Sequence, residues 1–488
     1  MLRTMKLSSI LPHNQALQVE GSPDVHITGL AFDSRKVSKG SVFFAIRGIQ
    51  SDGHSYIQSA VQGGAAAIIC EELPQSISPS AVYIKVANSA YTLGDMAALY
   101  YGDPSRKLKL VGITGTNGKT TTVTLLWRLM NNMGGKAGLI STVKNCIGTK
   151  ELPSSYTTPD ALELNQLLAS MVDEGCTHCF MEVSSHALVQ GRVQGLTFAG
   201  GIFSNITHDH LDYHKTFEEY IRAKKLFFDG LGKEAFALVN IDDRNGRIMV
   251  QNTLAKVKSY SLRAMADYKC RIVEHQLDGM MLIIDGLEMW TRLIGGFNAY
   301  NLLAVYATAR QLGFDKQDVL TALSGMEPVT GRFEHTVSGK GVVAIVDYAH
   351  TPDALSNVID TINSIKPNGK RLITVVGAGG NRDRTKRPVM AQVAIQGSEL
   401  VVLTSDNPRF EEPEDILNDM RAGVDAHSVG KLLVIADRRE AIRTAALLAS
   451  EGDFVLIAGK GHETYQEVKG VRHHFDDKEE VEKAFKQT

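Results

Sequence analysis

A loop that contains two glycines, at residues 114–121, is the first feature able to do chemistry. In KLKLVGITGTNGKTTTVTLLWRLM, residues 107–130, an apolar run precedes the loop and a helix-like pattern follows it. Backbone N–H groups of such a loop can point at phosphate oxygens, and the positive end of the following helix adds to the attraction. Lys119 would neutralise β- and γ-phosphate charge, and Thr120 would place its hydroxyl on Mg²⁺. The sequence therefore predicts nucleotide binding.

The spacing of this loop departs from the usual phosphate-binding loop, or P-loop. The common pattern G-x-x-x-x-G-K-[ST] places a glycine five residues before Gly118, and Ile113 occupies that position. Gly115 and Gly118 must therefore provide the backbone freedom. An ordinary glycine turn is the alternative, but GKT between a strand and a helix favours the P-loop. The loop leaves the type of reaction open.

Two clusters of polar side chains follow other apolar runs. MEVSSHAL ends such a run with Glu182, and SNITHDHLDYH places His210 among two aspartates and two further histidines. A lone histidine after a strand is more often solvated than a ligand. Together, beside a P-loop, the clusters offer a carboxylate and an imidazole for a divalent cation.

The rest of the chain has the pattern of a three-domain α/β protein. Residues 1–107 mix short strands and loops, residues 108–331 alternate strands with helices, and residues 332–488 repeat that alternation. Runs such as LVGIT, CFMEV, GIFSNI and AFALVNID are typical of parallel strands buried on both faces. We expect a central P-loop parallel-sheet ATPase domain and a C-terminal Rossmann-like α/β domain. Ligands of such sheets bind beyond the carboxyl ends of the strands.

Two local patterns add detail. The helix after the loop carries Val123, Leu126, Trp127 and Met130 at a spacing that predicts one apolar face. Residues 271–293 contain two DG turns and predict a small antiparallel insertion.

The composition argues against several classes of protein. With 43% hydrophobic and 22% charged residues and a net charge of -2, the 488-residue chain shows no basic footprint for nucleic acid. No apolar run approaches 18 residues, so we expect a cytoplasmic enzyme without a membrane partner. Five cysteines argue against a disulfide framework. Cys176 and Cys179 form a single C-x-x-C, which favours buried thiols over a redox or zinc role. We expect a monomer that binds small molecules.

Further motifs follow one another in order through nearly the whole chain. They are GITGTNGKTT, TTPD, MEVSSHALVQGRV, NITHDHLDYH, AKKLF, GFNAYN, GRFE, VDYAHTPDAL and GKGHE. Together they resemble the Mur ligase family of peptidoglycan synthesis. The family's loop reads T-G-T-N-G-K-T, so the displaced glycine is its normal form. The arrangement is most similar to members that add the third residue to UDP-N-acetylmuramoyl-L-alanyl-D-glutamate.

The resemblance implies an ATP-dependent amide ligase. A carboxylate oxygen attacks the γ-phosphate, giving an acyl phosphate and ADP, and an amine then displaces phosphate. Because both reactants of the first step are anionic, positioned cations must reduce their repulsion. Residues 1–107 would bind the UDP-muramoyl substrate, residues 108–331 ATP, and residues 332–488 the incoming amino acid. Closure of the domains would exclude water from the acyl phosphate.

The resemblance also implies residues for catalysis, nucleotide and metal. The catalytic residues would be Lys119, His210 and Lys224. The ATP-binding residues would be Gly115, Thr116, Asn117, Gly118, Lys119, Thr120, Thr121, Asn298, Asn301, Arg332 and Asp347. Two Mg²⁺ ions are expected, one on Thr120 and Glu182 and one on His210. Lys224 of AKKLF would react with CO₂ to form a carbamate, an anion beside the metal; a solvated helix lysine is the alternative.

Two stretches of the first segment, FDSRKV and GIQSDGHSY, resemble the UDP-binding elements of the family. The residues implied for the nucleotide-linked dipeptide are Ser34, Ile49, Gln50, Ser51, Thr157, Thr158, Ser184, Gln190 and Arg192. Phe32 stands where a leucine is frequent in the family, and a backbone contact there would survive the change.

The incoming amino acid is indicated by SDNPRFEEP. Arg409 lies inside D-N-P-R, the form seen in enzymes that add meso-diaminopimelate. That amino acid has a second carboxylate that lysine lacks, and a guanidinium can bind a carboxylate through two parallel hydrogen bonds. The implied pocket comprises Arg382, Asp406, Asn407, Pro408, Arg409, Gly459 and Glu463. A surface role for Arg409 after a proline turn is the alternative.

Two other interpretations remain at this point. Another acyl-phosphate ligase, such as folylpolyglutamate synthetase or the next Mur enzyme, would share the P-loop but not DNPR together with GKGHE. A nucleotide-switched binding protein would release phosphate without any amine. It would also leave Lys224, His210 and the arginine pocket without a role.

Overall fold

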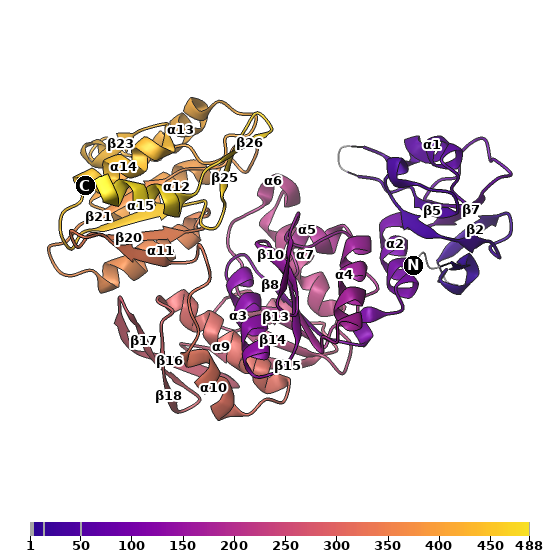
Figure 1. Cartoon of the computed structure of the whole chain (residues 1–488), viewed down its shortest axis with the longest axis horizontal. Coiled ribbons are helices and arrows are strands. Elements are labelled where there is room, and N and C mark those ends of the chain that lie inside the picture. Colours follow the sequence, from indigo (N-terminus) through magenta and orange to yellow (C-terminus); the bar gives the residue numbers. More distant parts are fainter. Residues whose placement is uncertain (1–3, 13–14, 49–50, 488) are drawn as a thin grey trace.

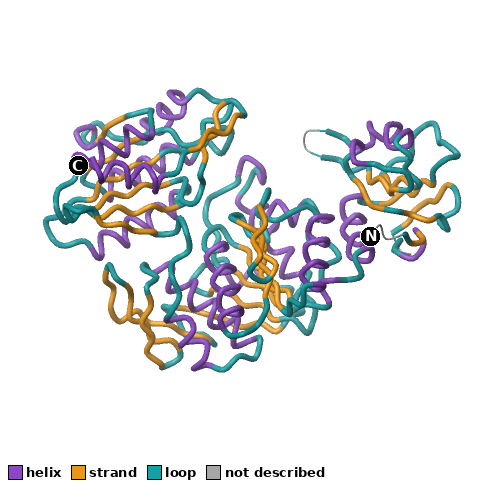
Figure 2. The backbone as a smooth tube through the Cα atoms, viewed as in Figure 1, coloured by secondary structure: helices purple, strands orange, loops and turns teal. Residues whose placement is uncertain are grey.

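The computed structural model describes residues 4–12, 15–48 and 51–487. Within these ranges the strands form three main sheets that follow one another from one end of the molecule to the other (Figure 1). Strands lie inside each unit and helices outside them (Figure 2). The predicted α/β class is confirmed. The domain limits at 107/108 and 331/332 remain predictions.

The N-terminal sheet is five-stranded and mostly parallel. Its order is β2 (Ala16–Glu20), β7 (Val82–Val86), β6 (Ala67–Cys70), β5 (Ser41–Phe44) and β4 (Gly29–Ala31), and β1 (Met5–Lys6) pairs with β3 (His26–Ile27) separately. Helices α1 (Ile57–Gln62) and α2 (Ser89–Tyr100) cover its two faces. Gly94 of α2 lies so close to the central domain that a Cβ there would be 2.7 Å from the Gln194 carbonyl oxygen. Only glycine fits this approach.

The central sheet is built around the strand that leads into the P-loop. Strand β8 (Lys109–Thr114) lies between β12 (His178–Glu182) and β13 (Gly200–Phe203), and all three are parallel. The whole eleven-stranded order also includes β11 (Lys150–Pro153), β10 (Lys144–Ile147), β9 (Ala137–Ile140), β14 (Phe236–Asn240), β15 (Lys256–Ser261), β16 (Tyr268–Gln276), β17 (Gly279–Ile284) and β18 (Leu287–Thr291). The predicted parallel strands are confirmed.

Helices cover both faces of this sheet because successive residues of its strands point to opposite sides. One face packs on α3 (Lys119–Asn132), α9 (Gly296–Gln311) and α10 (Lys316–Ser324). The other packs on α4 (Ala161–Asp173), α5 (Ser185–Val189), α7 (Phe217–Asp229) and α8 (Gly246–Met249), and α6 (Leu211–His214) precedes α7. All five cysteines are buried and free, which confirms the prediction for Cys176 and Cys179.

Two predictions for this domain were too narrow. The antiparallel strands expected at 271–293 exist, but β16 also pairs in parallel with β15, so they extend the central sheet. In α3, Val123, Leu126 and Met130 are buried and Trp127 is partly buried, but Leu125 is buried too. The helix lies between the sheet and α9, so it needs more than one apolar face.

The C-terminal sheet has six strands. Its order is β19 (Glu334–Val337), β20 (Val343–Asp347), β24 (Phe454–Ala458), β21 (Leu372–Val376), β22 (Leu400–Leu403) and β23 (Leu432–Val434). Helices α11 (Pro352–Ile365), α12 (Lys386–Gly397) and α13 (Pro413–Arg421) cover one face, and α14 (Arg438–Leu448) and α15 (Asp477–Gln487) cover the other. The hairpin of β25 (Tyr465–Val468) and β26 (Val471–His474) lies outside the sheet. In the described part of the chain, no helix is long and apolar enough to cross a membrane.

A fully buried ion pair joins the last helix, α15, to the rest of the C-terminal domain. Arg438 donates from Nε and Nη2 to the two carboxylate oxygens of Asp477, each at 2.7 Å, and neither side chain is exposed. Arg438 also donates to the Ala458 carbonyl at 3.1 Å, next to the end of β24. The pair therefore fixes α14 and α15 to the edge of the sheet that carries the site described below.

Replacing Asp477 by alanine should lower the free energy of unfolding by about 3–5 kcal/mol, because it leaves the buried Arg438 cation unpaired. Urea denaturation of variant and wild type measures the change. Asp24→Ala is the control: it removes a pair with Lys6 between largely exposed side chains and should cost about 1 kcal/mol or less. Equal losses in the two variants would contradict this account.

Candidate active site

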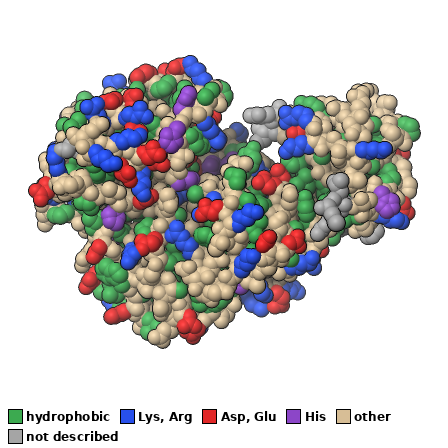
Figure 3. Space-filling view, in the orientation of Figure 1, with side chains coloured by type: hydrophobic (Ala, Val, Ile, Leu, Met, Phe, Trp, Pro, Cys, Tyr) green, Lys and Arg blue, Asp and Glu red, His purple; other side chains and the backbone are tan. Residues whose placement is uncertain are grey.

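A cavity of about 780 Å³ lies between the central and C-terminal domains and is lined by both. The surface is hollowed between these two parts of the molecule (Figure 3). The lining comes from the segments that follow β8, β12, β13 and β14 in one domain and β20, β21, β22 and β24 in the other. The carboxyl ends of two parallel sheets thus face a single cavity, as the sequence predicted for each sheet.

The P-loop is folded tightly against the segment after β13. Asn117 N donates to Asn205 Oδ1 at 2.9 Å, and Thr116 N donates to the Asn205 carbonyl at 2.8 Å. Gly118 precedes α3 with φ of 86°, and a Cβ there would lie 2.5 Å from Asn301 Oδ1. Lys119 Nζ donates to the Gly115 and Thr116 carbonyls at 2.9 and 2.8 Å. Burial, reinforced by the nearby Arg332, lowers the pKa of Lys119, while Glu182 and Asp209 act in the opposite direction.

Glu182 lies beside the P-loop because of the register of the central sheet. It pairs with Ile113 at the end of β8 and is 1% exposed. Its Oε1 accepts hydrogen bonds from the Thr120 hydroxyl at 2.9 Å and from Thr142 N at 2.8 Å. Oε2 has no hydrogen-bond partner among the described residues.

This set of ligands fits Mg²⁺ bound jointly with a phosphate. No cluster of three or more His, Cys, Asp or Glu side chains in the described ranges could hold a metal by itself. Mg²⁺ commonly uses one or two carboxylates together with substrate phosphates and waters. A carboxylate and a hydroxyl at the start of a P-loop helix match that habit.

Lys224 of α7 is 1% exposed and directed at the P-loop. Its Nζ donates to the Gly115 carbonyl at 2.8 Å and lies 4.6 Å from the centre of the Tyr220 ring. Burial, with repulsion from Lys119, lowers the pKa of Lys224 well below that of a solvated lysine. An uncharged amine is the form that can add to CO₂, so the residue fits a carbamate.

His210 lies on the strained turn before α6, with φ of 56°. Its ring is edge-on to that of His186, with ring centres 4.9 Å apart. Burial lowers the pKa of His210, against the attraction of Asp209, whose Oδ2 is 3.4 Å from Nε2. The imidazole is therefore neutral near pH 7, as a metal ligand must be.

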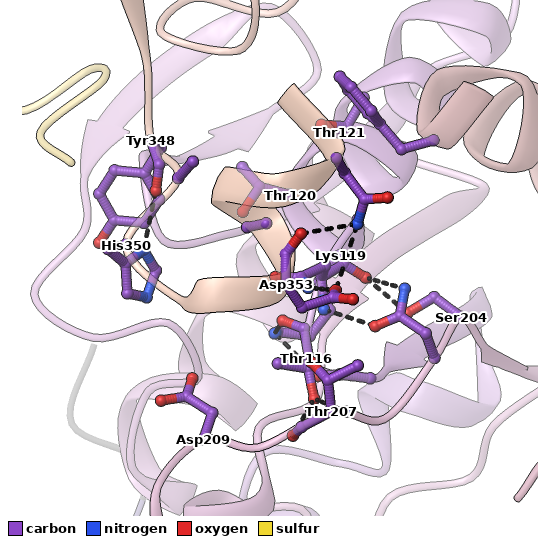
Figure 4. Close-up of a pocket in the computed structure, with 18 of the residues that line it drawn as sticks. Thr116, Lys119, Thr120, Thr121, Ser204, Thr207, Asp209, Tyr348, His350 and Asp353 are labelled. Carbon is purple, nitrogen blue, oxygen red and sulfur yellow. Dashed lines mark hydrogen bonds between the residues drawn. The ribbon is translucent and has the colours of Figure 1, made fainter. Parts of the chain in front are cut away.

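The C-terminal domain reaches directly into the P-loop. Arg332 Nη2 donates to Thr120 Oγ1 at 3.2 Å, and Asn117 Nδ2 donates to Asp353 Oδ2 at 2.8 Å. Figure 4 shows Asp353, Tyr348 and His350 of this domain among the residues that surround the P-loop. Asp347 accepts a hydrogen bond from Phe333 N at 2.7 Å, and burial raises the pKa of Asp347 to about 6.

The part of the cavity lined by the C-terminal domain carries both cationic and anionic side chains. These are the charges expected of a site that binds the carboxylate and the ammonium group of an amino acid. The predicted residues that line it are Arg382, Asp406, Asn407, Arg409, Gly459 and Glu463. Asn407 Nδ2 donates to Glu463 Oε2 at 2.8 Å, and Arg409 Nη1 donates to the Gly380 carbonyl at 2.7 Å. Pro408 does not line the cavity. It shapes the turn, accepting a hydrogen bond from Glu411 N at its carbonyl.

The residues predicted for the dipeptide divide into three groups. Thr157 and Ser184 line the cavity. Thr158, Gln190 and Arg192 lie behind them in one network, in which Arg192 Nη1 donates to the Thr158 carbonyl at 2.7 Å. Ser34 and Ser51 belong to the N-terminal domain and do not line this cavity, and Ile49 and Gln50 lie outside the described residues.

The predicted nucleotide residues mostly line the cavity, with one exception. Asn301 faces it, as do Thr121, Arg332 and Asp347. Asn298 does not, because it is buried behind Asn301, accepting a hydrogen bond from Asn301 Nδ2 at 3.1 Å. It supports the cavity-facing Asn301 rather than contacting the cavity itself.

Sequence reasoning missed one end of the cavity. The residues there are His275, Phe297, Tyr300, Val358 and Thr361. His275 accepts a hydrogen bond from Gly295 N and lies 3.2 Å from Ser364 Oγ in α11. Phe297 and Tyr300 stood inside the GFNAYN motif, but aromatic residues in a helix are more commonly part of the core. Asp353 likewise stood inside VDYAHTPDAL, where it resembles an ordinary first-turn acid.

The fold and the site define a P-loop protein in which two parallel-sheet domains line one cavity rich in charged side chains. Three domain families match the chain: "Mur ligase family, catalytic domain" at residues 26–101, "Mur ligase middle domain" at 113–309 and "Mur ligase, glutamate ligase domain" at 331–461. The chain belongs to the Mur ligase family.

Relatives cover the chain from end to end. It is 58% identical to the UDP-N-acetylmuramoyl-L-alanyl-D-glutamate--2,6-diaminopimelate ligase of Cytophaga hutchinsonii, over 97% of this chain and 98% of the relative. It is 54% identical to the ligase of the same name from Bacteroides fragilis, over 99% and 100%. A solved structure of an enzyme with that name superposes with a TM-score of 0.70 at 34% identity, covering 99% of both chains. The Mycobacterium tuberculosis folylpolyglutamate synthase, at 15% identity and a TM-score of 0.60 over 76% of this chain, shares the fold.

Gly118→Ala should weaken ATP binding about tenfold or more, a loss of about 1.4 kcal/mol. The new Cβ would collide with Asn301 Oδ1 and turn the loop amides away from the phosphates. Isothermal titration calorimetry measures the dissociation constant. Gly134→Ala is the matched control, since Gly134 has a similar φ of 82° but nothing within 4 Å of its Cβ position. If both variants bind ATP like the wild type, the close approach at Gly118 is irrelevant to binding.

Proposed function

We propose that this chain is an ATP-dependent ligase that joins meso-diaminopimelate to the D-glutamate of UDP-N-acetylmuramoyl-L-alanyl-D-glutamate. The observation that carries the proposal is the composition of one cavity. It has a P-loop at one wall and, on the opposite domain, two guanidinium groups together with the carboxylate of Glu463. The relatives that match nearly the whole chain bear the name of this activity.

The chain's own groups supply the positive charge that the first step needs. A substrate carboxylate oxygen attacks the γ-phosphorus of ATP, and ADP leaves. Lys119 and Arg332 reach the phosphate site from two domains and offset the repulsion between the two anions. Bound Mg²⁺ would neutralise further phosphate charge, with Thr120 and Glu182 holding one ion and His210 a second. The Lys224 carbamate would add a carboxylate-like group on the same wall of the cavity.

The second step joins the amine to the activated carbonyl. The uncharged amine attacks the acyl phosphate carbon, a tetrahedral intermediate forms, and phosphate leaves as the amine proton is lost. Arg382 and Arg409 would bind the distal carboxylate of the amino acid. Glu463 and the Gly459 carbonyl would bind its distal ammonium. The distal end of the amino acid is then fixed before the reaction and its other amine is oriented, which lowers the entropic part of the barrier.

The remaining assignments follow the domains. The end of the cavity with Phe297, Tyr300 and Val358 offers aromatic and apolar contacts for the adenine base. Residues 1–107 would bind the uridine diphosphate through Ser34, Ile49, Gln50 and Ser51. Residues 108–331 would bind ATP and the dipeptide, and residues 332–488 the amino acid.

Intact-mass and peptide analysis should find an increment of about 44 Da on Lys224, because burial lowers the pKa of its amine and CO₂ adds to uncharged amines. Lys224→Ala should lose ligase activity, and added short carboxylic acids should restore part of it. Lys225→Ala is the control, since Lys225 forms an ion pair with Asp229 on the same helix. If no mass increment is found and added acids restore no activity, the carbamate is ruled out.

The amine specificity tests the pocket. Removing one partner of a buried charge pair costs about 2–5 kcal/mol, so lysine should be disfavoured by roughly 30-fold to several thousand-fold in kcat/KM. Arg409→Ala should lose most of that preference. Steady-state ADP formation with each amine measures both effects, and comparable kcat/KM for L-lysine in the wild type would refute the assignment.

The same assay with a panel of amines and acceptors tests the function as a whole. ADP should form only when the nucleotide-linked dipeptide and meso-diaminopimelate are both present, and a new peptide bond should form in equal amount. Phosphate release without an amine would instead indicate a nucleotide-switched binding protein. ADP formation with a folate acceptor or with the product of this reaction would indicate another ligase of the fold.

A further inference from the structure

A third, fully buried guanidinium lies behind the two arginines of the amino-acid pocket. Arg387, near the start of α12, has no exposed side-chain surface and does not line the cavity. Its Nη1 donates to Glu411 Oε2 at 2.9 Å and to Asp419 Oδ2 at 2.8 Å. Its Nη2 donates to Glu411 Oε1 at 2.9 Å and to the Gly379 carbonyl at 3.2 Å. One planar group therefore bridges two loops and α13.

Those two loops carry the pocket. The first, residues 377–384, carries Arg382, and the second, residues 406–411, carries Arg409. They are also joined directly: Gly380 N donates to the Asn407 carbonyl at 2.9 Å, and Arg409 Nη1 donates to the Gly380 carbonyl. Glu411 Oε1, besides its bond to Arg387, accepts a hydrogen bond from Asn381 N. Arg387 is thus in contact with both loops at once, through Glu411 and through Gly379.

The loops need such a brace because their backbones are strained. Asn381 and Arg409 have φ of 50° and 53°, in the left-handed region that side chains other than glycine seldom adopt. The approach between the loops is also close, since a Cβ on Gly380 would lie 1.9 Å from the Pro408 carbonyl oxygen. Strained backbone persists only where the surroundings fix it. The Arg387–Glu411 pair provides that restraint from the buried side.

We propose that Arg387 is a positioning residue that sets the spacing of Arg382 and Arg409, and through it the preference for an amino acid with a second carboxylate. The inference rests on the proposed function of this pocket. Two guanidinium groups can distinguish an amino acid with a distal carboxylate from one with a hydrogen at that position only if both groups reach the carboxylate. Arg387 controls where their two loops stand relative to each other. It acts through Arg409 and touches no substrate.

Arg387→Lys tests the proposal because lysine keeps the charge but cannot bridge the same acceptors with a planar fork. We expect kcat/KM for meso-diaminopimelate to fall about 10- to 100-fold, mainly through KM. The ratio of kcat/KM for meso-diaminopimelate over L-lysine should fall by a similar factor. The KM for ATP should stay within about twofold of the wild type. A KM for the amino acid and a selectivity ratio equal to those of the wild type would overturn the proposal.

A double-mutant cycle separates positioning from general damage. If Arg387 acts through Arg409, Arg387→Lys should change the selectivity ratio less than about twofold in an Arg409→Ala background. Full additivity of the two effects would overturn the proposal. Arg384→Lys is the matched control: Arg384 binds the same Asp419 but is 63% exposed and makes no hydrogen bond to the loop at 406–411, so the ratio should stay at the wild-type value.

A second variant keeps the proposal testable if Arg387→Lys folds poorly. Glu411→Gln keeps the shape of the brace but removes its negative charge, and it should show the same loss of selectivity and the same dependence on Arg409. Thermal unfolding of each variant monitors the fold. The two hypotheses fail differently: a wild type that ignores meso-diaminopimelate refutes the proposed function, whereas a selective wild type with equally selective Arg387 and Glu411 variants refutes only this inference.

Discussion

Two lysine amines share one backbone carbonyl, and the rest of the site follows from that contact. Lys119 and Lys224 both donate to the Gly115 carbonyl, at 2.9 and 2.8 Å. Two ammonium groups so close together, away from water, repel each other strongly. One of them must lose its proton or an anion must come between them. The chain answers this repulsion by lowering the pKa of Lys224 and by placing Glu182 and Asp209 near Lys119.

The two parallel sheets explain why those charges can come from separate domains. Each sheet directs its loops toward one end, and the two ends face each other across the cavity. Polar contacts across this boundary include Asn117 with Asp353, Arg332 with Thr120 and His208 with Asp383. Polar contacts of this kind exchange readily with water and ligand, whereas a large apolar interface would lock the domains together. The boundary also has an apolar part, because Leu277, Ile294 and Phe297 of the central domain pack with the C-terminal core.

The sequence was informative wherever function depends on neighbours along the chain. The strand, loop and helix around Lys119 could be predicted, and so could the place of Glu182 at a strand end, because burial patterns identify strands and their carboxyl ends. Contacts between distant segments could not be predicted from such patterns. Asn117 and Asp353 are 236 residues apart, and Arg387 meets Glu411 only after α12 and α13 have packed. The pairing of β16 with β15 was also missed, since alternation shows which face of a strand is buried but not which strand lies next to it.

The chain passes from the central to the C-terminal domain only once, through residues 325–333 between α10 and β19. Any rotation of one domain against the other must pivot there, where Gly331 and Phe333 have φ of 69° and 52°. Arg332 lies within this connection, so a rotation about it would change the distance from Arg332 to Thr120 only a little. The arginines of the amino-acid pocket lie farther from this connection, so the same rotation would move them farther. The hydrogen bond between Arg332 and Thr120 would therefore be disturbed less by such a rotation than the position of the amino-acid pocket relative to the P-loop.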